Sequence, residues 1–100
     1  MSGQEMFAQA ITVEKEHLGG MRFKKSEVLN DKEEITTRKK LLEIATSLGN
    51  VYRRKVKILF EVEEGLKRVE TTIWATTEGN IILKGGRIIP IHCIRQVSIF

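Results

Sequence analysis

The hydrophobic pattern changes its period near Gly49-Asn50, and this change constrains the fold more than any other feature of the sequence. Before it, apolar residues recur every three or four positions, as on one face of an α-helix. After it, apolar and polar residues alternate, as in a strand with one buried face. The sequence therefore predicts an α+β fold, in which N-terminal helical segments pack on a C-terminal antiparallel β-meander.

Residues 3–18 are predicted to form the first helix, because apolar residues recur within it at helical spacing. Ser2 and Glu5 have the spacing of a capping box. The pair Gly19-Gly20 supplies a residue that can take positive φ where a helix ends. Residues 21–29 follow as either a short strand or an extended connector.

Residues 32–48 are predicted to form the second helix. Asp31 is placed to cap it, Glu34 completes a second capping box, and Gly49-Asn50 ends it. Its apolar stripe consists of Ile35, Leu41, Leu42, Ala45 and Leu48. The charged residues that lie largely off this stripe are Arg38, Lys39, Lys40 and Glu43.

A β-hairpin is predicted next, because apolar residues alternate with polar ones from Val56 to Val62 and again from Val69 to Ala75. Between these runs, Glu64-Gly65 fits a two-residue turn, which fixes the register of the two strands. The predicted cross-strand pairs are Phe60 with Val69, Ile58 with Thr71, Val56 with Ile73, and Glu61 with Arg68.

The rest of the chain is predicted to be short strands joined by turns at 77–80 and 84–86. Pro90 cannot donate to a strand ladder, so we expect it at an edge or a bend. The spacing from Ile91 to Ile94 indicates one tight turn before a last strand. Strands that are apolar on both faces must be buried on both. We expect one face to line the interior of a curled sheet and the other to pack against the second helix.

One hundred residues fit a single domain. We expect residues 1–30 to form a helix plus an extended segment, 31–49 a helix, and 51–100 an antiparallel sheet. A helix followed by about five short strands, over residues 32–100, is similar in architecture to small SH3-like and Sm-like barrels. That resemblance implies a sheet that curls into a small barrel.

Sm-like proteins carry an Asp/Asn pair near the middle hairpin and an Arg-Gly in a late strand. This chain has Asn80 in a turn and Ile-Ile-Pro-Ile in its late segment, so we transfer no binding residues from that family. The stretches 69–77, 83–86 and 89–91 also resemble a small uncharacterised bacterial protein family. This second resemblance implies no activity.

Composition narrows the class of protein. With 41% apolar and 30% charged residues, the chain has the composition of a globular domain. It contains no apolar run near the length of a membrane span and no secretory leader pattern. Cys93 stands alone, which excludes an internal disulfide and favours a cytoplasmic location. His92 and Cys93 are neighbours that point to opposite faces of a strand, so we expect no metal, no cofactor and no catalytic site.

The strongest candidate for a binding site is a basic group at the helix-to-strand junction. The net charge is +4 and the isoelectric point is near 9.4, which permits anionic partners. Clustered cations neutralise phosphates and release counterions. The group consists of Arg53, Arg54, Lys55 and Lys57, and the predicted fold could bring Arg38, Lys39 and Lys40 nearby. The alternative is an ordinary solvated face, whose field is partly cancelled by Glu61, Glu63, Glu64 and Glu70.

Two aromatic residues accompany the basic group. The predicted register turns Trp74 out of the sheet interior, opposite Lys55, where it could stack on a base or anchor an interface. The alternative is that Trp74 packs beneath a helix. Tyr52 either joins the same surface or caps the core.

We therefore expect a non-catalytic binding module that engages RNA or DNA through the basic group. The alternative is a protein-interaction or self-associating domain, such as a homodimer, without nucleic-acid binding. Its motivation is the N-terminal helix and an apolar surplus along predicted strand edges. That surplus consists of Ile88, Ile89, Ile99 and Phe100.

Overall fold

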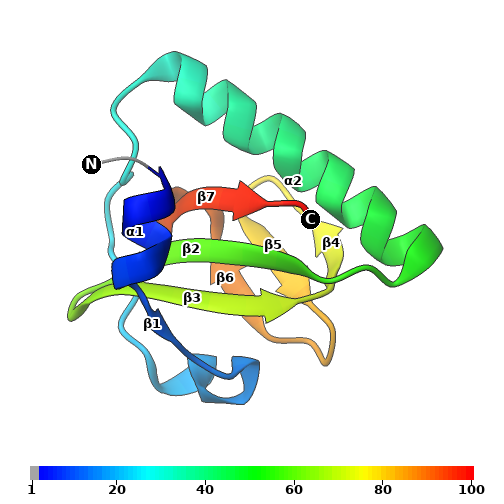
Figure 1. Cartoon of the computed structure of the whole chain (residues 1–100), viewed down its shortest axis with the longest axis horizontal. Helices are drawn as coiled ribbons and strands as arrows, with labels where there is room; N and C mark the ends of the chain where they lie inside the picture. Colours follow the sequence, from blue (N-terminus) through cyan, green and yellow to red (C-terminus); the bar gives the residue numbers. More distant parts are fainter. Residues whose placement is uncertain (1–2) are drawn as a thin grey trace.

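A computed structural model describes residues 3–100 and the side chains of residues 6–100. It confirms an α+β fold, with a long helix lying along two packed sheets (Figure 1). No helix in the described part of the chain is long and apolar enough to cross a membrane. The elements are α1 (Gly3–Gln9), β1 (Ile11–Thr12), the 3₁₀ turn η1 (Lys15–Gly20), α2 (Lys32–Tyr52), β2 (Val56–Val62), β3 (Gly65–Thr71), β4 (Ile73–Thr76), β5 (Asn80–Leu83), β6 (Ile88–Pro90), the 3₁₀ turn η2 (Ile91–Cys93) and β7 (Ile94–Ser98).

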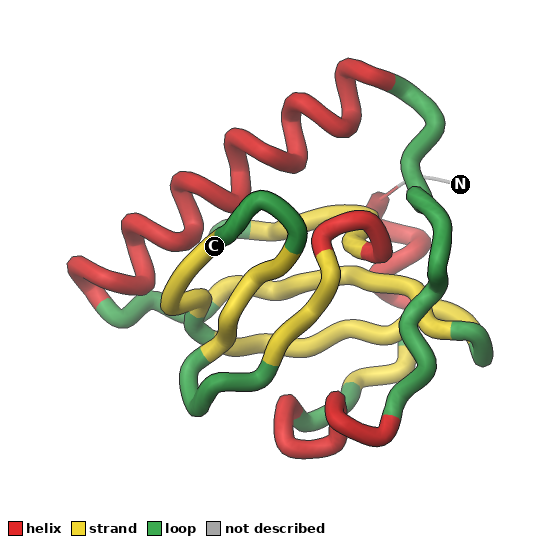
Figure 2. The backbone as a smooth tube through the Cα atoms, turned by 180° about the vertical axis from the view of Figure 1, so that it is seen from behind, coloured by secondary structure: helices red, strands yellow, loops and turns green. Residues whose placement is uncertain are grey.

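The strands form a four-stranded sheet in the order β1-β3-β2-β7 and a three-stranded sheet in the order β4-β5-β6. The two sheets lie one behind the other, and the chain passes between them at Thr72 (Figures 1 and 2). The core fills the space between their inner faces. Its fully buried side chains include Val56, Ile58, Phe60, Ile73, Ile81, Leu83 and Ile89.

The β2–β3 hairpin is confirmed, but its predicted register is wrong by two residues. The turn residues are Glu63 and Glu64, and Val62 pairs with Gly65, which has φ +136°. A glycine takes this conformation easily, so the turn closes one position earlier than predicted. A shift of two keeps every side chain on its face, and the predicted inward set remains correct. The observed partners are Phe60 with Lys67, Ile58 with Val69, Val56 with Thr71, and Glu61 with Leu66.

The strand predicted to continue from Val69 to Ala75 is interrupted at Thr72. Beyond this residue, Ile73 pairs with Leu83 of β5 instead of Val56. Trp74 therefore belongs to the three-stranded sheet, and its predicted position opposite Lys55 is wrong.

The later turns are confirmed. The Thr77 backbone N–H donates to the Asn80 carbonyl at 2.8 Å, and that of Gly86 donates to Leu83 at 2.8 Å. Pro90 lies on β6, which is an edge strand of its sheet. The tight turn expected before the last strand is η2.

The predicted first helix is wrong beyond Gln9. Ile11–Thr12 pair in parallel with β3, and η1 then buries Leu18. The successive β-branched residues at 11–13 lose side-chain freedom in a helix, and here they extend the free edge of β3. The proposed cap at Ser2 lies outside the described residues. The following segment is an extended connector with a single bridge, between Phe23 and Val62.

Helix α2 begins as predicted, because the Asp31 carboxylate accepts the Glu33 backbone N–H at 2.8 Å. Its predicted end is wrong, since the helix continues through Gly49-Asn50 to Tyr52. Gly49 is required by packing: a β carbon there would lie 2.4 Å from the Ile73 carbonyl oxygen. Helix α2 therefore comes closest to the backbone of β4 at Gly49, the residue that has no side chain.

Arg38 was predicted to lie off the apolar stripe, and this is wrong. Its side chain is only 5% exposed. The guanidinium binds both carboxylate oxygens of Glu27, at 2.7 and 2.6 Å, and donates to the Ile94 carbonyl at 2.9 Å. Arg38 thus ties α2 to the connector on one side and to the start of β7 on the other. Its hydrogen bond holds the pKa of the Glu27 carboxyl below the ordinary value of 4.5.

We expect Gly49→Ala to lower the free energy of unfolding by ~2 kcal/mol, because the added carbon overlaps backbone that cannot move aside cheaply. The intrinsic helix preference of alanine offsets only part of this loss. Urea denaturation measures the change. Asn50→Ala, at the exposed next position, is the matched control and should leave the midpoint nearly unchanged. Equal stability of Gly49→Ala and the wild type would contradict the close crossing.

Glu27 should make stability depend on acid pH. Its pKa is lowered on folding, so its contribution is present above its unfolded pKa and is lost as pH falls through the folded one. Glu27→Gln should remove this part of the dependence and cost ~1–3 kcal/mol at neutral pH, because the buried guanidinium loses its charged partner. Denaturation midpoints of both proteins between pH 7 and pH 3 test this expectation. If the midpoints of the two proteins changed with pH in parallel, the Glu27–Arg38 pair would make no pH-dependent contribution to stability.

Candidate nucleic-acid interface

The structure divides the predicted basic group at the end of α2. Arg54 and Lys57 are both engaged by the last residue: the Arg54 guanidinium donates to the Phe100 carbonyl, and the Lys57 ammonium lies 4.8 Å from the centre of the Phe100 ring. Lys55 is exposed. Arg53 is also exposed and lies apart from this contact, at the C-terminal cap of the helix.

The second run of predicted cations does not join the first. Arg38 is buried in its ion pair and cannot reach a ligand at the surface. Lys39 and Lys40 are exposed, but they precede Arg53 by about 20 Å along the helix axis at ~1.5 Å per residue. Arg38, Lys39 and Lys40 therefore do not form one patch with Arg53.

Arg53 instead lines a hollow of about 320 Å³ where α2 crosses the corner between the two sheets. We call it the Trp74 hollow. Trp74 is 47% exposed, so its ring borders the hollow without being covered. The other lining residues are Gly49, Asn50, Arg53, Thr72 and Lys84.

Backbone contacts fix the walls of the Trp74 hollow. The Lys84 backbone N–H donates to the Thr72 carbonyl at 2.9 Å, and the Thr72 hydroxyl contacts the Arg53 carbonyl at 3.4 Å. Thr72 is itself buried, so the helix end and the turn after β5 are both attached to a fixed point. Arg53, Trp74 and Lys84, which come from three parts of the fold, thereby line one hollow.

Among the side chains that the structure describes, the cations of the hollow form no ion pair. Within residues 6–100, the ion pairs are Arg22–Glu63, Arg38–Glu27 and Arg95–Glu61, and none includes Arg53 or Lys84. Lys15 adds a further charge near the same turn, since its Nζ lies 3.9 Å from where a β carbon of Gly85 would be. The hollow is therefore an electropositive site with an aromatic wall.

Comparisons with protein-family models, with curated proteins and with solved structures found no match.

Arg53 has an unusual backbone conformation, with φ 55° and ψ 34°. It is the one non-glycine residue with positive φ in the described chain. Its N–H closes the helix by donating to the Gly49 carbonyl at 3.0 Å. Glycine is the usual residue at such a cap, so the arginine is held here at a cost in stability.

The two aromatic residues have different surroundings. Trp74 is neither buried beneath a helix nor fully free, since it stands beside the end of α2. Tyr52 is 74% exposed, so the option that it caps the core is wrong. Lys84 was not named from the sequence as a site residue. Its turn was recognised, but its position beside Trp74 depends on the pairing of Ile73 with Leu83.

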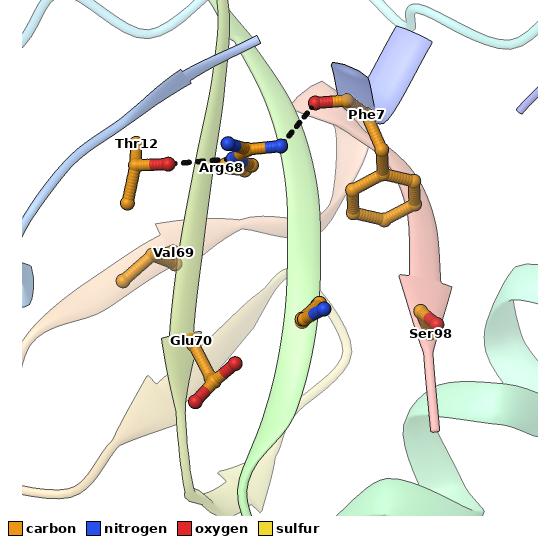
Figure 3. Close-up of a pocket in the computed structure, with 7 residues that line it drawn as sticks. Phe7, Thr12, Arg68, Val69, Glu70 and Ser98 are labelled. Carbon is orange, nitrogen blue, oxygen red and sulfur yellow. Dashed lines mark hydrogen bonds between the residues drawn. The ribbon is translucent and has the colours of Figure 1, made fainter. Parts of the chain in front are cut away.

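A larger hollow of about 450 Å³ lies on the outer face of the four-stranded sheet (Figure 3). Its arginine is already used: Arg68 donates to the Thr12 hydroxyl and to the Phe7 carbonyl, both at 2.6 Å. Glu70 also lines it and offsets the positive charge. Arg68 fastens the N-terminal segment to β3, so this hollow is a poorer anion site than the Trp74 hollow.

His92 and Cys93 lie in the 3₁₀ turn η2, so their predicted position on a strand is wrong. Burial raises the pKa of the Cys93 thiol to about 12, which keeps it protonated at neutral pH. The His92 ring Nε2 lies 2.6 Å from the Lys24 carbonyl oxygen. In the part of the chain that the structure describes, no group of three His, Cys, Asp or Glu residues is placed to hold a metal ion.

Arg53→Gly should raise the free energy of unfolding by ~1 kcal/mol, because glycine takes the left-handed conformation without the penalty of a β carbon. Thermal or urea denaturation measures the change. Lys55→Gly, two residues on and outside any helix or strand, is the control and should not stabilise the protein. A loss of stability in Arg53→Gly would show that the arginine side chain supports the fold.

Proposed function

We propose that this chain is a non-catalytic binding domain that engages RNA or DNA as a single strand, through the Trp74 hollow. The observation that carries the proposal is that half-exposed Trp74 lines one hollow together with two cations, Arg53 and Lys84, and that no ion pair within residues 6–100 includes either cation. In this arrangement the cations contact phosphates and the ring accepts a base.

Both parts of the contact have a known energetic basis. Stacking of a base on an aromatic side chain contributes ~1–3 kcal/mol, and it tolerates any sequence because every base has a flat face. Phosphate contacts release counterions, which makes the affinity fall with salt. A base inside a duplex is already stacked on its neighbours, so the exposed ring favours single strands.

The strained cap at Arg53 is consistent with a binding role. Non-glycine residues in the left-handed region are found most often at functional sites, where the strained backbone positions a side chain for its role. Here the conformation directs the chain away from the helix axis at the rim of the hollow. Glycine would close the helix at lower energy but would offer no charge.

We also propose that the two sheets form a small SH3-like barrel. The support is the strand order: β2 pairs with both β3 and β7, and the chain bends at Thr72 so that β4 joins β5 and β6 in the facing sheet. The 3₁₀ turn η2 before the last strand fits the same architecture. In this arrangement the Trp74 hollow lies at the bend of the second barrel strand, beside the helix that covers the barrel.

Titration with a single-stranded oligonucleotide should quench the fluorescence of Trp74, the only tryptophan in the chain. Binding should weaken as salt increases, and each charge removed by Arg53→Gly or Lys84→Ala should reduce the slope of log affinity against log salt by about 0.7. Trp74→Leu, followed by anisotropy of a labelled oligonucleotide, should lose affinity without changing the slope, by about tenfold for ~1.4 kcal/mol of stacking.

Lys40→Ala is the matched control, because it removes an equal charge from an exposed site far from the hollow. It should leave both affinity and slope nearly unchanged. Binding that is independent of salt, or equal effects of Lys40→Ala and Lys84→Ala, would refute the proposed site. A duplex of the same sequence should bind more weakly than the single strand.

A further inference from the structure

Helix α2 has two apolar stripes, although the sequence had suggested one. The first faces β4 and contains Leu42, Ala45 and Gly49, all of them buried. The second contains Leu41, Ile44, Leu48 and Val51. Ile44 is 50% and Val51 68% exposed, whereas Leu41 and Leu48 are partly buried, so the second stripe lies along the border between core and surface. We call it the outer stripe.

The outer stripe has the spacing of a helix-pairing seam. Its members follow one another at intervals of three, four and three residues, which is the a/d pattern of helices that pack lengthwise. A helix that is apolar on two faces normally buries both of them. The fold covers the first stripe and packs Leu41 of the outer stripe against the core, but it leaves Ile44 and Val51 open.

Neighbouring surface features continue the outer stripe at both ends. Towards the N-terminus, Leu41 lines a hollow of about 470 Å³ beside β7, the edge strand that runs alongside α2 (Figure 1). Most of the other side chains that line this hollow are polar or charged, among them Glu33 and Glu34. Towards the C-terminus, Phe100 is 53% exposed and is held next to the helix by Arg54. The surface is therefore elongated, as a helical partner requires.

The charges at the two ends of α2 indicate which partner fits. The first turn and its cap are acidic, with Asp31, Glu33 and Glu34 exposed. The last turn of α2 has no basic residue, but the helix is followed directly by the exposed cations Arg54 and Lys55. No ion pair within residues 6–100 includes any of these five side chains. A second α2 laid antiparallel brings each acidic end towards a basic end, whereas a parallel one brings like charges together.

We propose that the outer stripe binds a second copy of this chain, forming a two-fold dimer in which the two α2 helices pack antiparallel. Such an interface is self-complementary, as two-fold symmetry requires. It is separate from the Trp74 hollow, which lies on the side of α2 that faces β4. The strand-edge surface that first suggested self-association is weaker, because Ile89 is buried in the core.

Sedimentation equilibrium on the full chain tests the dimer. The wild type should be a dimer, and Ile44→Glu should be a monomer, with a dissociation constant raised at least tenfold. Ile88→Glu is the matched control, since Ile88 is 49% exposed on β6, and it should remain a dimer. A monomeric wild type at high concentration would overturn the proposal, and so would dissociation caused by Ile88→Glu but not by Ile44→Glu.

A charge exchange tests the orientation and does not depend on the folding of Ile44→Glu. Glu33→Lys with Glu34→Lys should weaken the dimer at low salt, and adding Arg54→Glu with Lys55→Glu should restore it. Circular dichroism verifies that each variant is folded. Recovery of the dimer in the variant with all four substitutions would support the antiparallel arrangement of the two α2 helices. A further loss of the dimer in that variant would overturn this arrangement.

Discussion

The bend at Thr72 is the constraint on which the rest of the structure depends. One strand of the hairpin leaves the four-stranded sheet there and enters the three-stranded sheet, which turns the two inner faces towards each other. Helix α2 crosses the same bend, and the crossing is possible because Gly49 has no side chain to meet the Ile73 carbonyl. Helix, bend and the turn carrying Lys84 are then joined by contacts to buried Thr72. The Trp74 hollow is a consequence of this junction.

Much of the fold was predictable because its signals are local. The change from helix to strands, the two later turns and the acidic cap at Asp31 each depend on a few neighbouring residues, and these are confirmed. The errors arise where distant contacts override local preference. Residues 11–13 leave the expected helix because β3 offers them a free edge, and α2 passes its expected stop because Gly49 serves packing against β4. A two-residue error of register left the inward faces correct.

The candidate site was predictable only in part, and for the same reason. Arg53 and Trp74 could be named from the chain, one by its basic neighbours and the other by its outward position on a strand. Lys84 reaches them through the pairing of β4 with β5, and Arg38 leaves the surface through its contact with Glu27. A run of cations in a sequence does not show which of their side chains are engaged in contacts within the folded protein. Here Arg38 and Arg68 serve the structure, while Arg53 and Lys84 line the Trp74 hollow and form no ion pair within residues 6–100.

The two proposals describe opposite sides of one helix, and they support each other physically. A single small hollow with two cations and one ring holds few nucleotides, so its affinity alone is modest. A two-fold dimer through the outer stripe carries two such hollows in a fixed relation. One strand that reaches both converts its second contact into an intramolecular event, at an effective concentration far above that of the free protein. The proposed self-association through α2 would thus add affinity to the proposed binding by one small domain of 100 residues.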